Sequence, residues 1–344
     1  MRLRCWAAVL LAAVPAWAQG DPVAELARRI REGKVRVQFD ARRGYLPWLL
    51  EALGIPAASQ MLVFSKTSVQ AMLIEPDNPR RLYFNDSVVV GTVRGGSMEV
   101  VAQDPRNGLQ FYLVDQNAAR FREDVPPFSR RPDCMNCHLS HTTGLAEIRL
   151  RSVHPGPTGA PLDPHAPDTD NRTPFARLWG GWFVTGTVEA AHLGNTRWDG
   201  RNRPVAVPPP ETSDVAALLV FEHQARMMNL LARAARDASA VPDLVDAMLF
   251  VDEAPLPAPV RGASGFTEAF EARGPRDRRG RSLRDLDLRT RLLRYPCSYM
   301  IYSPAFRALP EATRAAIDRR MRQVLARRDA WDREAILEIL RDTM

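Results

Sequence analysis

The sequence predicts an α+β protein with an antiparallel β meander in its N-terminal part, a central segment with further strands, and a helical C-terminal region. Three observations support this fold class. β-Branched and aromatic residues fill the strand-like runs of residues 60–115, and Gly, Asn, Asp and Pro separate those runs. From residue 212 onward, apolar residues instead recur with the helical period of about 3.6.

The first 18 residues have the pattern of a secretory signal peptide. Arg2 and Arg4 form a basic start, an apolar run covers 5–17, and small residues lead to an expected cleavage after Ala18. An N-terminal membrane anchor is the alternative, but the run is too short for a permanent span. No later stretch is long and apolar enough either. We therefore expect a periplasmic protein with no stable membrane span after signal removal.

Residues 19–125 form the predicted β-rich N-terminal region. A short helix at 22–32 precedes the strand-like run RLYFNDSVVVGTV at 81–93. The Gly pair at 95–96 and DPRNG at 104–108 are turn signals that separate two further strand-like runs. This order predicts a meander of neighbouring strands.

The central segment, residues 126–210, begins around the sequence CMNCH. Two stretches in it, GLAEIRLRSV at 144–153 and LWGGWFVTGTV at 178–188, are predicted as strands. A loop rich in Pro, Gly and Asp connects them.

Residues 211–344 form the predicted helical region. In the run 212–238, Leu219, His223, Met227 and Leu230 fall on one stripe of a helix. Further helices are predicted near 284–294, 311–327 and 330–342.

The basic charge is almost entirely arginine. The net charge is +7, and lysine occurs only at Lys34 and Lys66. The charge is spread along the chain without a concentrated basic tract, so we expect no nucleic-acid partner for an exported protein.

Cysteine usage gives the strongest functional signal. Of four cysteines, Cys134, Cys137 and Cys297 remain after signal removal. The run Cys134 to His138 is Cys-x-x-Cys-His, the attachment pattern of c-type haem. Two thiols so spaced can bond both vinyl groups of one porphyrin, and the adjacent histidine can bind the iron as proximal ligand. The motif occurs once, which predicts one covalent haem c.

Three other interpretations of the motif are possible. Cys134, Cys137, His138 and His141 could bind zinc, although adjacent ligands suit one tetrahedral ion poorly. The cysteine pair could be a thioredoxin-like redox centre, but a loop precedes it where that site needs a strand. A chance pattern or a plain disulfide is the third.

The second axial ligand is less constrained by the sequence. His223 is the first candidate, because it lies on the inward stripe of a rigid helix. His192, Met227 and Met228 are alternatives, and so is an open iron.

The expected function depends on whether the haem iron has one or two strong axial ligands. Two strong ligands suit electron transfer to redox partner proteins, whereas an open iron suits a peroxidase-like haem enzyme or a redox or gas sensor. The sequence favours electron transfer, and leaves the oligomeric state undetermined.

Several segments together resemble a family of exported bacterial proteins labelled only as cytochrome c-type proteins. The resemblance covers most of the chain from Ser65 to Phe306. It implies covalent haem at Cys134, Cys137 and His138 and a periplasmic setting, and its EHQ element favours His223. The segments are SKTSVQ, RLYFNDSVVVGTVRGG, CMNCH, WGGWFVTGT, HLGN, LVFEHQARMMNLL and RYPCSYMIYSPAF.

Overall fold

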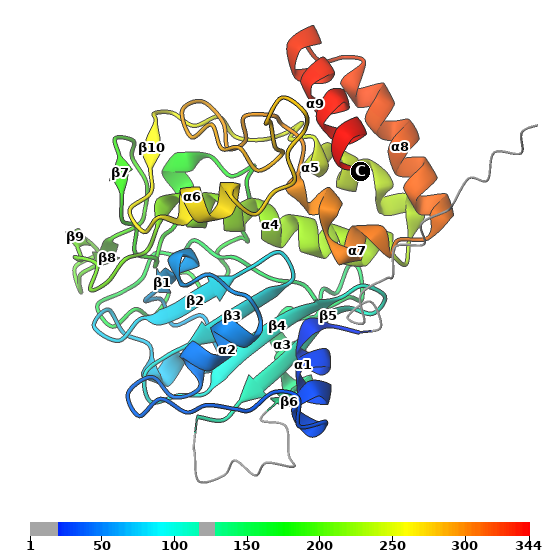
Figure 1. The fold of residues 1–344 in the computed structure, drawn as a ribbon. Coiled ribbons are helices and arrows are strands. Elements are labelled where there is room, and N and C mark those ends of the chain that lie inside the picture. Colours follow the sequence, from blue (N-terminus) through cyan, green and yellow to red (C-terminus); the bar gives the residue numbers. More distant parts are fainter. Residues whose placement is uncertain (1–19, 117–127) are drawn as a thin grey trace, which may run out of the picture.

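The computed structural model describes residues 20–116 and 128–344, so the predicted signal peptide and the boundary at 125 lie outside the described residues. Within them the fold is α+β, as predicted. Figure 1 shows a β-sheet in the N-terminal half and a group of helices in the C-terminal half, with helix α4 (Val215–Ala234) lying between them.

The sheet is an antiparallel meander of six strands in chain order. The predicted turns at Gly95 and Gly108 are present, and both glycines have positive φ, which other residues adopt at a cost. The sixth strand belongs to the central segment, so the sheet extends beyond the predicted N-terminal region. The strands are β1 (Met61–Val63), β2 (Arg80–Phe84), β3 (Val88–Thr92), β4 (Met98–Asp104), β5 (Gly108–Val114) and β6 (Phe128–Arg130).

The two faces of the sheet are covered by different helices. Val100 and Tyr112 pack with α1 (Pro22–Arg31) and α2 (Leu46–Ala52). Leu109 and Phe111 point the other way and pack with α4. This alternation follows from the two-residue period of a strand.

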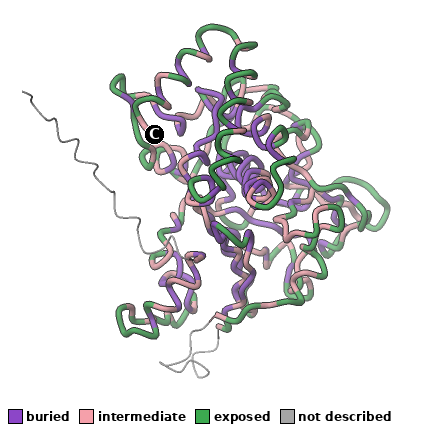
Figure 2. Tube along the Cα trace, turned by 90° about the vertical axis from the view of Figure 1, so that its right-hand side faces the viewer, coloured by how far each residue is buried: buried purple, intermediate pink, exposed green. Residues whose placement is uncertain are grey.

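Helix α4 forms the centre of the larger core. It begins at Asp214, whose side chain accepts hydrogen bonds from the backbone N–H groups of Ala216 and Ala217. Most of its residues are buried, and these include the polar Glu222, His223 and Gln224. Figure 2 shows the buried residues gathered in the middle of the molecule. The helices after it are α5 (Val241–Met248), α6 (Phe266–Glu271), α7 (Pro304–Arg307), α8 (Glu311–Leu325) and α9 (Ala330–Thr343).

The predictions for the central segment were wrong in detail. Residues 144–153 form no regular strand, and only Thr187–Val188 (β7) of 178–188 does. Trp179 has φ 66°, so the backbone turns where a strand would have to continue.

Other short strands are β8 (Thr196–Trp198), β9 (Pro204–Ala206) and β10 (Val260–Arg261). Short turns of helix are η2 (Ala57–Ser59), η3 (Ala71–Leu73), η5 (Pro132–Cys134), α3 (Met135–His138), η6 (Phe175–Arg177), η7 (Ala238–Ala240) and η8 (Tyr299–Tyr302).

The predicted helix at 284–294 is also absent. Asp287 accepts hydrogen bonds from the N–H groups of Arg289 and Thr290, and Leu288 has φ 54°. An aspartate that binds the backbone just ahead of it favours a turn over a helix. The helices predicted at 22–32, 212–238, 311–327 and 330–342 are confirmed, with slightly shifted ends.

A membrane-spanning helix was not expected. None of the helices in residues 20–116 and 128–344 combines the length and the apolar character needed to cross a bilayer.

We predict that Asp214→Ala lowers the free energy of unfolding by about 3 kcal/mol or more, because several hydrogen bonds to a buried charge are lost. Besides capping α4, its Oδ2 accepts from the N–H groups of Ala263 and Ser264 at 2.6 and 2.8 Å. Urea unfolding measures the change. Asp237→Ala removes an exposed cap and is the control, with an expected loss of about 1 kcal/mol. Equal losses would contradict the prediction.

Candidate functional site

The Cys-x-x-Cys-His motif lies on a single turn of helix. Strand β6 and the turn that begins at Pro132 lead into α3, which ends where Leu139 adopts an extended backbone. Cys134 is half-buried, Cys137 is exposed, and both thiols are free. The structure therefore offers both thiols to one ligand, and the disulfide alternative is not formed.

His138 is already oriented as a metal-binding imidazole would need to be. Its Nδ1 lies 2.8 Å from the carbonyl oxygen of Glu147, and its ring centroid lies 4.6 Å from that of Phe111. A carbonyl can only accept, so Nδ1 carries the proton and Nε2 keeps its lone pair. No hydrogen bond to Nε2 is found in the described part of the chain. Burial lowers the pKa of His138, which favours the neutral form that binds iron.

A partly buried carboxylate lies close to the motif on the same face of the sheet. Glu99 pairs with Arg80 and accepts hydrogen bonds from Ser68 at 2.7 Å and Gln70 at 3.1 Å. Burial opposes its ionisation, but these partners outweigh burial and lower its pKa. The Glu99 charge acts in turn on His138. A charged network therefore adjoins the imidazole.

The third cysteine has a different environment. Cys297 is fully buried, and burial raises the pKa of its thiol to about 12. A protonated thiol in an apolar core is unreactive. Burial also raises the pKa of Cys134, but that residue remains half-accessible.

His223 lies in the core beside α5 and the C-terminal turns. Its Nε2 is 2.8 Å from the hydroxyl oxygen of Ser298, and its ring stacks on Phe250 at 4.2 Å. Its Nδ1 is buried without a partner. No ring contact or hydrogen bond joins it to His138 among residues 20–116 and 128–344. Its role as distal ligand stays a prediction, and would require it to leave Ser298.

The alternative ligands are also held by packing. Met227 and Met228 are fully buried in the α4 core. His192 is half-buried, and its ring centroid lies 5.6 Å from that of Trp179, with Nδ1 unpartnered. None of the three contacts the motif in a hydrogen bond or ring pair found in the described chain.

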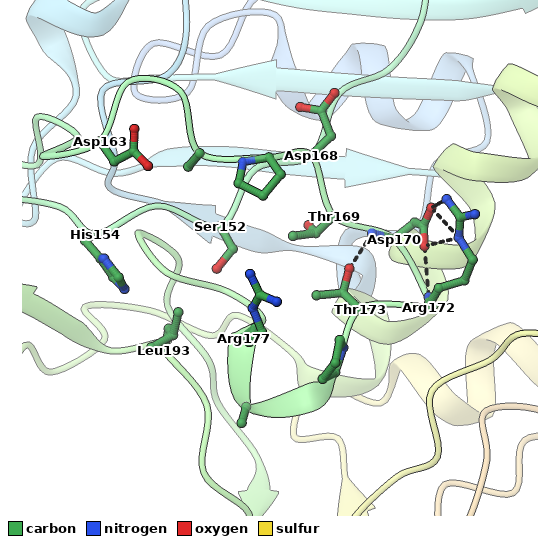
Figure 3. A pocket seen from close by; sticks show the side chains of 14 residues that line it. Ser152, His154, Asp163, Asp168, Thr169, Asp170, Arg172, Thr173, Arg177 and Leu193 are labelled. Carbon is green, nitrogen blue, oxygen red and sulfur yellow. Dashed lines mark hydrogen bonds and ion pairs between the residues drawn. The ribbon is translucent and has the colours of Figure 1, made fainter.

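A pocket of about 680 Å³ lies on the loops of the central segment. Asp168 in its wall binds Arg149 at 2.8 Å, and Arg149 donates to the carbonyl oxygen of Cys137 at 3.2 Å. Figure 3 shows the Arg177 side chain pointing into the pocket. None of the predicted haem residues lines it. Arg149 thus links the pocket wall to the motif through hydrogen bonds, but the motif residues do not line the pocket.

The residues at the motif fit a covalently bound haem. Two accessible thiols share one turn, and a neutral imidazole beside them has its Nδ1 proton engaged by a carbonyl. When bound, haem c would supply one-electron redox chemistry at its iron. No group of three or more His, Cys, Asp or Glu side chains in the described ranges is arranged to hold a metal ion.

Comparison with protein-family models, with curated proteins and with solved structures finds no match. Sequence reasoning found the motif but missed the Glu147 carbonyl and the Glu99 network. A backbone carbonyl has no residue-type signal, and Glu99 is brought to the motif only by strand pairing.

We predict that His223→Gln removes part of the loss of stability at acid pH. Burial lowers the pKa of His223 to about 3, with a smaller effect of Arg226. The unfolded chain binds a proton near pH 6.5 and the folded chain does not. The contribution of neutral His223 to the free energy of unfolding is therefore complete above pH 6.5. It is lost as pH falls toward 3, by at most about 1.4 kcal/mol per pH unit.

Urea unfolding at pH 7 and pH 5 measures this loss. We expect a smaller pH effect in His223→Gln than in wild type, and no difference for the exposed control His154→Gln. An unchanged pH effect in His223→Gln would contradict the prediction. The visible spectrum of the same variant tests whether His223 binds iron.

Proposed function

We propose that the protein is a periplasmic mono-haem c-type cytochrome that transfers electrons through a haem covalently bound to Cys134 and Cys137, with His138 as proximal ligand. The observation that carries the proposal is the 2.8 Å contact between His138 Nδ1 and the Glu147 carbonyl, next to two free thiols. A chance Cys-x-x-Cys-His run would not need its histidine in the tautomer that leaves Nε2 free.

The accessibility of the motif supports electron exchange with partner proteins. Cys137 is exposed, and Leu139 directly after the motif is 40 % exposed. A haem attached there would have part of its edge near the protein surface. Redox partners need such an edge, because they exchange electrons without binding to the iron itself. The predicted signal peptide supports the periplasmic setting, since c-type haem is attached outside the cytoplasm.

We predict that material matured in a haem-competent host carries one haem by mass. Cys134→Ala and Cys137→Ala should each leave at most one thioether bond, and the double variant should leave none. Denaturing gel electrophoresis with haem staining, together with intact mass, checks this. Cys297→Ala is the matched control and should keep its haem, because Cys297 is a core thiol. Wild-type protein with the mass of the bare polypeptide would exclude the proposed function.

We predict that the reduced protein keeps its low-spin spectrum when carbon monoxide is added, because an electron carrier has both axial positions filled. Visible spectra with and without carbon monoxide, and with cyanide on the oxidised form, check this. Ready binding of either ligand would instead support the alternative, a peroxidase-like haem enzyme or a sensor. Turnover with peroxide and a reducing dye would separate those two.

A further inference from the structure

One turn of the N-terminal region exposes an unusual amount of apolar surface. The segment that contains η3 carries Val69, which is 75 % exposed, and Met72, which is 88 % exposed. Leu73 beside them is also exposed. Single exposed apolar residues are ordinary on a protein surface, but three in five residues form a patch that some partner should cover.

This turn is held firmly in place. The Gln70 side chain donates to the carbonyl oxygen of Ser97 at 3.0 Å and accepts from the N–H of Ser97 at 2.8 Å. Asn78 donates to the carbonyl oxygen of Leu73 at 2.7 Å. A Cβ on Gly96 would meet Gln70 and Leu73, so the hairpin approaches the turn closely. The exposed thioether of Met72 is therefore presented by a fixed backbone.

The turn and the haem motif meet the sheet at neighbouring positions. Glu99, which binds Ser68 and Gln70, pairs with Leu113 across β4 and β5. Phe111, which contacts the His138 ring, is the diagonal neighbour of Glu99 on the same face. Diagonal neighbours lie about 7–8 Å apart. The turn therefore approaches the motif from the side of Glu99.

Strand β3, which flanks β4 on the side away from β5, leaves room for the ion pair that holds Glu99. Gly91 in β3 pairs with Glu99, and a Cβ there would lie 2.6 Å from Arg80 Nη2. The missing side chain lets Arg80 lie across the sheet and reach Glu99. The ion pair thus holds Glu99, and with it Ser68 and Gln70 of the turn, on this face of the sheet.

We propose that the Met72 thioether is the sixth ligand of the haem iron, and that the turn carrying Val69, Met72 and Leu73 covers the distal face of the haem. This inference rests on the proposed function. A soft thioether opposite an imidazole is a recurring haem environment, and the apolar neighbours of Met72 match the apolar porphyrin. Met61 and Met98 of the sheet and Met227 and Met228 of α4 are fully buried.

The test uses the full chain matured with haem, as wild type, Met72→Ala and Met72→His. Met344→Ala, which removes another exposed methionine, is the control. We expect the oxidised wild type and the control to show the far-red thioether-to-iron charge-transfer band. Met72→Ala should lose this band, become high-spin or bind carbon monoxide, and have a lower midpoint potential. Met72→His should restore a low-spin spectrum without the band.

The outcomes separate the two proposals. A haem-loaded Met72→Ala variant whose band, spin state and potential equal those of wild type overturns the inference and leaves the proposed function intact. Loss of the low-spin spectrum in His223→Gln but not in Met72→Ala overturns it in favour of His223. Absence of haem from wild type overturns both. Circular dichroism of each variant verifies the fold, and a Met72→Ala variant that retains its haem but binds carbon monoxide supports the inference.

Discussion

The arrangement of the whole molecule depends on the two-residue alternation of the meander. Along β4 and β5, one set of side chains packs against α1 and α2, and the other set faces α4. A shift of the pairing by one residue would exchange the two faces, so burial on both sides fixes the register. Because β6 pairs with β5 and runs directly into the motif, the same register determines where Cys134, Cys137 and His138 lie.

The face toward α4 changes character within two residues of β4. Val101 packs with the apolar core, whereas Glu99 carries a partly buried charge. A charge that is partly withdrawn from water is unfavourable unless it is paired and hydrogen-bonded. Arg80, Ser68 and Gln70 offset this cost. Around Val101, this face of the sheet packs against the apolar core. Around Glu99, it holds the turn that carries Met72 near the Cys-x-x-Cys-His motif, and these are the two segments proposed to enclose the haem.

The parts of the structure that the sequence could predict are those governed by local periodicity. The meander follows from strand alternation and turn glycines, α4 from its apolar period and Asp214 cap, and the motif from its cysteine spacing. The strand predicted at 178–188 failed because the backbone turns at the buried Trp179, whose φ is positive, and residues 144–153 pair only through isolated bridges. The contact between Gln70 and Glu99 joins residues 29 apart, which no local pattern reveals.

The choice between a buried and an exposed distal ligand can be argued from what each side chain would have to give up. Moving His223 would break its contact with Ser298, end its stacking on Phe250 and leave a cavity in the core. Losses of this kind cost about 3–5 kcal/mol together. Met72 has no buried contacts to lose, and fixing its side chain costs at most about 2 kcal/mol of rotamer entropy. Before any difference in iron affinity, the protein therefore favours the exposed thioether. A core histidine would become the ligand only if its stronger bond to iron exceeded the cost of rearranging the interior around α4.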